Sequence, residues 1–243
     1  MLIKACLNGS REPGALDALP LSPNELARAA QSAIVAGAGA LHIHPRRADG
    51  TQSFAAEDCG AAFAAVRASC PGTSVGGTTA AWIEPDVQRR QTLIQAWQIL
   101  PDFVSVNFSE AGTAELCTLL LAKGIGVEAG LATIDDARLL LTLGIADRCT
   151  RLLFEPGEQE MGAALAVVDA IERVLDDASV QTSKLLHGFE ATAWPLLEVA
   201  LQRGYDTRIG LEDTLHLPDG RQARDNAQLV SVAYERAQQA GRI

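Results

Sequence analysis

Two histidines spaced two residues apart are the clearest candidates for chemistry in this sequence. His42 and His44 are two of only four histidines, and they end a short apolar run. In an extended strand, side chains at i and i+2 point to the same side, so both imidazoles project together where the strand gives way to the loop 45–53. Paired imidazoles suit a divalent ion of borderline softness such as zinc. The pair alone is a weak signal, since an isolated imidazole often only hydrogen-bonds in place. Its position at a strand end strengthens it.

The composition disfavours several classes of partner. The 243-residue chain is 48% hydrophobic, enough for one large barrel or two smaller domains. Acidic residues outnumber basic ones 30 to 20, so neither nucleic acid nor an anionic membrane is an expected partner. No apolar run approaches the ~20 residues that a membrane span needs, and the N-terminus does not resemble a signal peptide. Five scattered cysteines without C-x-x-C spacing indicate a reduced, cytoplasmic protein.

Short strand-like runs alternate with longer helical segments along the chain. The expected strands are Leu2–Leu7, Ala40–His44, Ser74–Thr78, Phe103–Asn107, Gly126–Glu128, Thr150–Glu155, Lys184–Gly188 and Thr207–Gly210. The expected helices are Pro23–Ala36, Ala55–Ser69, Asp86–Ile99, Thr113–Lys123, Ile134–Leu143, Glu160–Leu175, Thr192–Arg203 and Arg224–Ala240. Eight such units without a linker predict an α/β protein whose residues 1–243 form a single (β/α)8 TIM-barrel domain. The alternative is a doubly wound open sheet, but no glycine-rich phosphate loop follows the first strand.

In a barrel of this kind, chemistry takes place at the C-terminal ends of the strands. The polar and ionisable residues expected there are Asn8, Arg11, Glu12, His42, His44, Arg46, Thr78, Thr79, Asn107, Ser109, Glu110, Glu128, Glu155, His187, Arg208, Glu212 and Asp213. Because closure places the eighth strand beside the first and second, Glu212 is expected near His42 and His44. Two imidazoles and one carboxylate with a position left open form the ligand set of a catalytic zinc site. The alternative for Glu212 is a solvated loop or a helix cap.

Four of these residues have further interpretations. Desolvation of Glu128 at a strand end suits proton transfer, and a structural salt bridge is an equal alternative. The guanidinium of Arg208 suits a bidentate contact with a substrate carboxylate. Arg46 is expected either to meet an anionic ligand group or to face solvent. His187 is interpreted as part of the core or wall, in preference to a substrate contact.

The sequence resembles the β-keto acid cleavage enzyme family, whose founding activity is cleavage of 3-keto-5-aminohexanoate. The matching segments are Leu7–Arg11, Pro20–Leu26, Ala36–Arg46 with Asp49–Gly50, Phe103–Asn107 and Arg208–Asp213. They cover essentially the whole chain in order. The combination of His-x-His-x-Arg…Asp-Gly with Arg-x-Gly-x-Glu-Asp is fairly specific to this family.

The resemblance implies a TIM barrel that binds zinc through His42, His44 and Glu212. It also implies a Claisen-type exchange without a redox step, in which a β-keto acid and the co-substrate acetyl-CoA give acetoacetyl-CoA or a new acyl-CoA. The zinc ion acts there as a Lewis acid that stabilises an enolate. The expected partners are therefore a small-molecule β-keto acid and a CoA thioester.

The resemblance also assigns roles to individual side chains. Arg208 and Asp213 match a pair that deprotonates the substrate, and Glu128 matches a glutamate on the fifth strand. A hydroxyl residue after the third strand matches either Thr78 or Thr79. The full set of expected substrate-binding residues is Thr78, Thr79, Asn107, Ser109 and Arg46.

The sequence departs from the family pattern at two places. Arg47 stands where the family usually has aspartate, and the loop after the first strand is short. Because Arg11, Arg46 and Arg47 are expected at the same rim, we predict a neutral or anionic β-keto acid in preference to the amino one. Two alternatives stay open: a zinc-dependent hydrolase or aldolase that does not use CoA, and a barrel that binds a metabolite without catalysis. We also expect a homo-oligomer.

Overall fold

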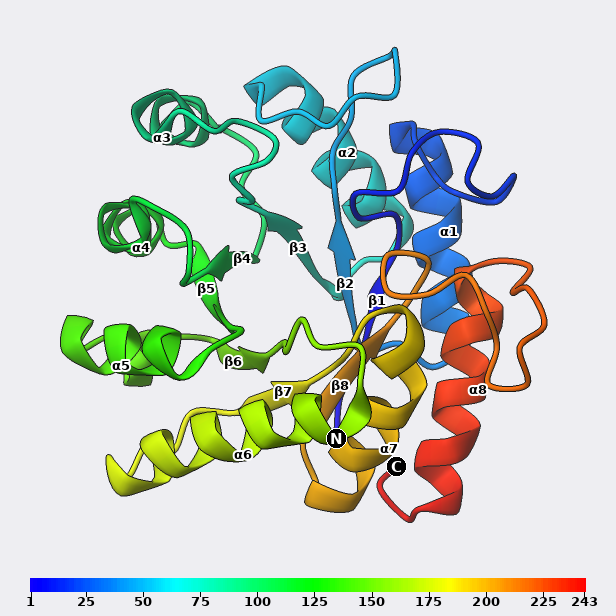
Figure 1. The fold of residues 1–243 in the computed structure, drawn as a ribbon. Coiled ribbons are helices and arrows are strands. Elements are labelled where there is room, and N and C mark those ends of the chain that lie inside the picture. Colours follow the sequence, from blue (N-terminus) through cyan, green and yellow to red (C-terminus); the bar gives the residue numbers. More distant parts are fainter.

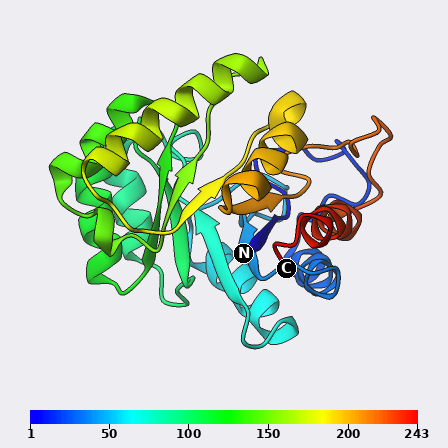
Figure 2. The same ribbon diagram turned by 90° about the horizontal axis from the view of Figure 1, so that it is seen from below.

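Eight parallel strands close into a barrel in the order of the chain. The computed structural model describes residues 1–243. The strands are β1 (Ile3–Cys6), β2 (Ala40–Ile43), β3 (Ser74–Thr78), β4 (Phe103–Asn107), β5 (Gly126–Leu131), β6 (Arg151–Phe154), β7 (Lys184–Leu186) and β8 (Asp206–Ile209). The helices are α1 (Pro23–Val35), α2 (Ala56–Ser69), α3 (Val87–Gln95), α4 (Thr113–Ala122), α5 (Ile134–Leu143), α6 (Met161–Asp177), α7 (Ala193–Arg203) and α8 (Asn226–Gln239). The helices surround the strands (Figures 1 and 2), which confirms the predicted (β/α)8 barrel.

Local signals in the sequence explain where the helices begin and end. Helix α1 starts with a capping box, because the Ser22 hydroxyl accepts from the Glu25 amide and the Glu25 carboxylate accepts from the Ser22 amide. Helices α5 and α7 end at Gly144 and Gly204, which have φ angles of 63° and 73°. This left-handed conformation costs glycine little and stops a helix. The ends of these helices are therefore set by residues close in sequence.

The hydrophobic core lies between the strands and the helices that surround them. Residues such as Leu41, Val75 and Val127 point outward from the barrel and are fully buried in this layer. All five cysteines are buried and unpaired. No helix combines the length and the apolar character that crossing a membrane requires.

Charged side chains fill the barrel interior near the N-terminal ends of the strands. Lys4 of β1 and Glu128 of β5 form a fully buried ion pair. Arg151, the first residue of β6, lies 2.5 Å from the other oxygen of Glu128 and also contacts Asp206 of β8 at 3.1 Å. This layer packs the lower half of the barrel, so the space available to a ligand lies at the C-terminal ends of the strands.

Candidate active site

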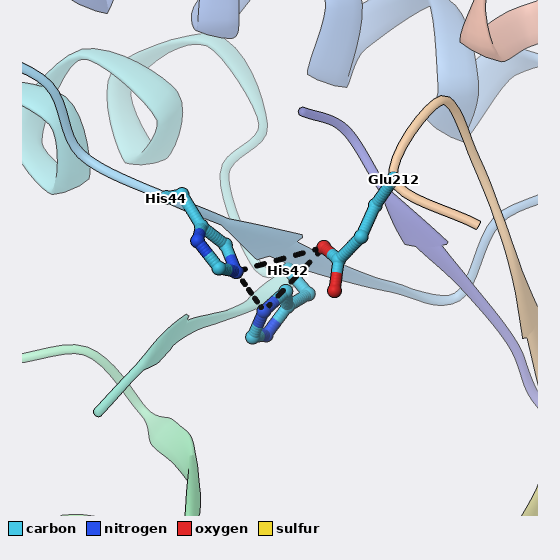
Figure 3. Close-up of side chains that lie close together, drawn as sticks. All are labelled: His42, His44 and Glu212. Atoms are coloured by element: carbon cyan, nitrogen blue, oxygen red, sulfur yellow. Dashed lines mark hydrogen bonds and ion pairs between the residues drawn. The ribbon is translucent and has the colours of Figure 1, made fainter. Parts of the chain in front are cut away.

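Three side chains with metal-binding atoms meet at the C-terminal end of β2. His42 is in β2, His44 follows it directly, and Glu212 comes from the segment after β8. The Nε2 atoms of the two histidines are 3.1 Å apart, and each lies 3.7 Å from Oε2 of Glu212. Figure 3 shows the two rings and the carboxylate turned toward one another. The spacing of two residues and the closure of the barrel therefore bring the three predicted ligands together.

The protonation states of these groups fit a divalent metal ion. Burial lowers the pKa of both His42 and His44, so both imidazoles are neutral. Burial alone would raise the pKa of Glu212, but the charge of the neighbouring Arg208 guanidinium is the largest opposing effect, and the pKa is lowered to about 2. Metal ions bind neutral imidazole and ionised carboxylate. Oε2 of Glu212 is buried without a hydrogen-bond donor in the chain, and three protein ligands leave a further position for a substrate. The site fits the zinc ion that was predicted.

Neighbouring side chains orient the His44 ring. Its Nδ1 lies 2.5 Å from Oε1 of Gln52, which leaves Nε2 as the atom that faces Glu212. Asn8, after β1, exchanges two hydrogen bonds of 2.9 Å with the backbone of His44. The indole of Trp82 lies nearly parallel to the His44 ring, with centroids 6.4 Å apart, and is 56% exposed. An aromatic surface thus covers one side of the candidate metal centre.

A buried arginine and aspartate lie next to the metal-binding cluster. Nη2 of Arg208 contacts Glu212 at 3.0 Å and Asp213 at 2.7 Å, and its Nε also donates to Asp213. Burial raises the pKa of Asp213 to about 7 despite the lowering effect of Arg208, and the neighbouring Glu212 carboxylate adds to the rise. Oδ2 of Asp213 is buried without a partner. Asp213 therefore has one oxygen held by Arg208 and one oxygen free to accept a proton.

Glu155 and His187, two of the polar residues that were expected at strand ends, lie beside Asp213. Nε2 of His187 lies 3.3 Å from Oε2 of Glu155, and its Nδ1 lies 3.9 Å from Oδ1 of Asp213. The His187 ring packs edge-on against Phe189 at 4.8 Å. Burial raises the pKa of Glu155 to about 7 and lowers that of His187. Both residues directly follow strands, which is the position from which the sequence placed them at this end of the barrel.

The alternation of side chains distinguishes Thr78 from Thr79. A Cβ at Gly76 would meet the ring of Phe103 inside the barrel, whereas one at Gly77 would meet a phenylalanine of α2 outside it. Thr78 is two residues from Gly76 and therefore faces the interior. Its hydroxyl oxygen accepts from the amide of Ala80, so its proton remains available to a ligand. Thr79 donates to a backbone carbonyl of β4 instead.

Of the two predicted substrate-binding residues near the end of β4, Asn107 lies at the barrel mouth and Ser109 does not. Asn107 is the last residue of β4, and its amide nitrogen donates to Glu110 at 2.8 Å. Ser109 lies on the following turn and is exposed. The structure gives Ser109 no contact with the groups that surround the metal-binding cluster.

The expected position of Glu128 at a strand end is wrong. Strand β5 continues to Leu131, and Glu128 lies in its lower half with its two oxygens bound to Lys4 and Arg151. Three further residues extend the strand because their backbone pairs with β4 and β6. The alternative interpretation of Glu128, a structural salt bridge, describes its contacts.

The expectation that Arg46 faces solvent is wrong, whereas its contact with a ligand stays a prediction. Its guanidinium is buried and donates to the backbone carbonyls of Gly9, Arg11 and Gly50 at 2.7–2.8 Å. Arg46 thus joins the loops that follow β1 and β2. Arg11 forms an ion pair with Glu190 from the loop after β7. Of the three arginines that suggested a neutral or anionic substrate, Arg11 is paired, Arg46 is buried, and Arg47 is exposed without an ion pair.

The fold and this cluster define a (β/α)8-barrel protein with a candidate metal centre at the end of the barrel where such proteins carry their active sites. The chain belongs to the beta-keto acid cleavage enzyme family, whose model matches residues 1–243. This result confirms the resemblance noted in the sequence.

Two curated relatives and one solved protein illustrate the similarity. The chain is 26% identical over 239 residues to a 3-keto-5-aminohexanoate cleavage enzyme of Fusobacterium nucleatum subsp. nucleatum, with 93% of this chain and 86% of the relative covered. It is 22% identical over 240 residues to an enzyme of the same name from Acetoanaerobium sticklandii, with coverage of 92% and 86%. The apo structure of ObcA matches with a TM-score of 0.73 at 16% identity, covering 92% of this chain and 62% of ObcA.

ObcA has also been solved in two complexes. One is a ternary complex with a C4-CoA adduct and oxalate, and the other a binary complex with oxaloacetate. This chain spans less than two thirds of the ObcA chain. At this level of identity the likeness shows the fold.

Proposed function

We propose that this protein is a zinc-dependent enzyme that exchanges acyl groups between a β-keto acid and acetyl-CoA. The observation that carries the proposal is the cluster of His42, His44 and Glu212 beside the buried pair Arg208 and Asp213. Membership of the family supports the β-keto acid as substrate. The CoA adduct bound to ObcA supports a thioester as the second substrate.

The exchange needs no oxidant or reductant. The bond between the keto carbon and the methylene carbon of the β-keto acid breaks, and the methylene carbon bonds to the acetyl carbon of acetyl-CoA. The acyl group that is released bonds to the CoA sulfur. The products are a new acyl-CoA and acetoacetate, so all atoms are accounted for. A zinc ion in the site would supply Lewis acidity toward the ketone oxygen.

The side chains of this protein have separate tasks in the reaction. Nη1 of Arg208 makes no hydrogen bond within the chain and can bind the substrate carboxylate. Oδ2 of Asp213 accepts a proton from the methylene carbon and returns it to that carbon when acetoacetate forms, while Arg208 holds the other oxygen in place. The Thr78 hydroxyl donates to a substrate oxygen. These groups lie in a buried site, where electrostatic interactions are stronger than in water.

Metal analysis tests the first part of the proposal. Purified protein is expected to hold one equivalent of zinc, and His42→Ala is expected to lose it. His216→Ala is the matched control, because His216 is exposed and outside the cluster. Titration of metal-free protein with Co²⁺ provides a second measurement, since quenching of Trp82 fluorescence reports on an ion next to His44. Zinc retained in full by His42→Ala would contradict the assignment.

Turnover assays test the second part. A panel of β-keto acids is incubated with and without acetyl-CoA, and both acyl-CoA and acetoacetate are measured. The proposal requires that the two products appear in equal amounts and only with acetyl-CoA. Turnover that is independent of CoA would favour a hydrolase or aldolase, and inertness with intact zinc would favour a binding protein. Light scattering and cell fractionation test the homo-oligomer and the cytoplasmic location, which stay predictions.

A further inference from the structure

Three consecutive backbone carbonyls lie in the segment after β8 that carries Glu212 and Asp213. The carbonyl of Leu211 accepts from Nε of Arg11 at 2.9 Å, and that of Glu212 accepts from Nη2 of Arg11 at 3.3 Å. The carbonyl of Asp213 accepts from the amide of Glu190 at 2.7 Å. The chain offers no other donor to these three carbonyls. Two residues from other loops therefore hold the whole segment.

The two residues that hold this segment are also joined to each other. Nη2 of Arg11 forms an ion pair with Oε1 of Glu190. Arg11 lies in the loop between β1 and α1, whereas Glu190 lies between β7 and α7. The backbone of Arg11 is held in turn by Arg46, whose guanidinium donates to the Arg11 carbonyl at 2.7 Å. These contacts link the loops after β1, β2 and β7 to the loop after β8.

The backbone of Glu190 adopts a conformation that its surroundings must enforce. Its φ angle is 47°, in the left-handed region that residues with a Cβ rarely adopt. Residues in such conformations persist only where the surrounding structure over-determines them, and they cluster at functional sites. The ion pair with Arg11 leaves 49% of the Glu190 side chain exposed, and pairs of this kind contribute little to stability. Stability alone therefore does not account for this arrangement.

The loop after β1 also contacts the side chain of Glu212. Gly9 has a φ angle of 51°, and a Cβ at this position would lie 2.3 Å from Cγ of Glu212. The same loop therefore contacts both the side chain and the backbone carbonyl of the candidate metal ligand. Metal sites tolerate deviations of only about 0.2 Å in the distances to their ligands. A shift of the segment would move Oε2 of Glu212 relative to His42 and His44, whose Nε2 atoms each lie 3.7 Å from it.

We propose that Arg11 and Glu190 are positioning residues, which together fix Glu212 for a metal ion and Asp213 for the substrate. This inference rests on the proposed function. Arg11 acts through the carbonyls of Leu211 and Glu212, and Glu190 acts through its amide and through its ion pair with Arg11. Substitution of residues that orient a metal ligand typically lowers metal affinity by about 10–100-fold.

The test measures metal affinity separately from stability. The metal-free forms of the wild-type protein, Arg11→Met, Arg11→Lys and Glu190→Gly are titrated with Co²⁺, and the visible absorption of the bound ion reports on its ligand geometry. The Tm of each metal-free protein is measured by circular dichroism. Arg138→Met is the control, because it removes an exposed arginine from an ion pair with Asp135 on α5.

Arg11→Met is expected to raise the Kd for Co²⁺ about 10–100-fold, because two carbonyls of the segment lose their donor. Arg11→Lys keeps the positive charge but lacks the planar fork that reaches both carbonyls, so it should recover little of this affinity. Glu190→Gly removes the ion pair and also the strained φ angle, so its Tm should stay close to that of the wild type while its Kd rises about threefold or more. Arg138→Met should leave both quantities unchanged.

A Kd for Co²⁺ that is unchanged in Arg11→Met and Glu190→Gly would overturn the inference. If Arg11→Met does not fold, Glu190→Gly and Arg11→Lys decide by the same comparison.

If the wild-type protein binds no divalent metal ion, the metal-dependent part of the proposed function fails, and hydrogen exchange then decides about the positioning. The amides of Glu212 and Asp213 both donate to backbone carbonyls in the metal-free protein. Exchange of these two amides should be about fivefold faster or more in Arg11→Met, because a segment with fewer contacts opens more readily. Equal exchange rates in the two proteins would reject the positioning role.

Discussion

Substitution of Glu128 by glutamine tests whether this residue is structural. The substitution keeps the shape of the side chain but removes the charge that compensates Lys4 and Arg151. The Lys4 ammonium is fully buried and has no other acidic partner. Breaking a buried ion pair by removing one partner costs about 3–5 kcal/mol, because the remaining charge is left without compensation. For a chain of this size, that loss lowers Tm by roughly 6–20 °C.

Urea unfolding followed by circular dichroism measures this loss directly. The double variant Lys4→Met with Glu128→Leu is the control, since it removes both charges and is expected to recover most of the stability. Zinc content and kcat/KM are then measured on the folded fraction of each variant. If Glu128→Gln unfolds at the wild-type urea concentration but loses more than about a hundredfold in kcat/KM, the structural role is wrong. Proton transfer by Glu128, the alternative interpretation of its position in the sequence, would then be the better explanation.

Three further substitutions probe the contacts described above. The pKa of Glu155, raised by burial to about 7, means that the native state retains a proton between pH ~4.3 and pH ~7 that the unfolded chain releases. The free energy of unfolding of the wild-type protein should therefore fall as the pH rises through this window. Relative to wild type, Glu155→Gln should gain about 2–3 kcal/mol between pH 5 and pH 8. If the two proteins show parallel curves of stability against pH, Glu155 is not a buried ionisable group. Arg46→Met should lose about 2–4 kcal/mol in urea unfolding, because three backbone carbonyls lose a charged donor, and a changed substrate preference without this loss would return Arg46 to the site. Gly130→Ala should displace the Glu155 carboxyl, because the added Cβ would lie 2.2 Å from its Oε1, and a dependence of stability on pH identical to that of the wild type would show that the two side chains do not compete for space.

The fold and the metal-binding cluster could be predicted because both depend on short, regular spacings. Eight alternating units without a break indicate a barrel, and its closure forces β8 beside β1 and β1 beside β2. Two histidines at i and i+2 share a side whatever the details of the loops. Glu212 reaches the two histidines provided only that the chain turns back toward the barrel after β8. These three ligands therefore follow from topology more than from packing.

The position of Glu128 within its strand could not be predicted from the sequence, because β5 contains a glycine near its end. Gly130 is typical of a turn, and the expected strand therefore ends before it. In the structure, Gly130 lies within the strand. The position requires a glycine because a side chain there would overlap the carboxyl of Glu155. A residue on a neighbouring strand thus determines the local sequence, and no local pattern reports it.

The roles of the arginines depend on the paths of long loops. Arg46 reaches the carbonyls of two different loops, and Arg11 pairs with Glu190, which is far away along the sequence. A count of positive residues near the expected site could not distinguish an arginine that faces a ligand from one that joins two loops. The prediction of a neutral or anionic substrate was therefore the weakest. It relied on the number of arginines near the site, whereas the structure shows that Arg11 and Arg46 bind other groups of the protein.

The contrast between Arg208 and Arg46 shows what determines whether a strand-end residue is functional. Both are buried arginines near the same end of the barrel. The hydrogen bonds of Arg46 all go to backbone carbonyls, and only its Nε is buried without a partner, whereas Arg208 binds two carboxylates that each retain a buried free oxygen. A buried polar atom without a partner costs free energy unless a ligand satisfies it. The free oxygens of Glu212 and Asp213 therefore identify the side of the barrel mouth where a metal ion and a substrate would restore the missing interactions.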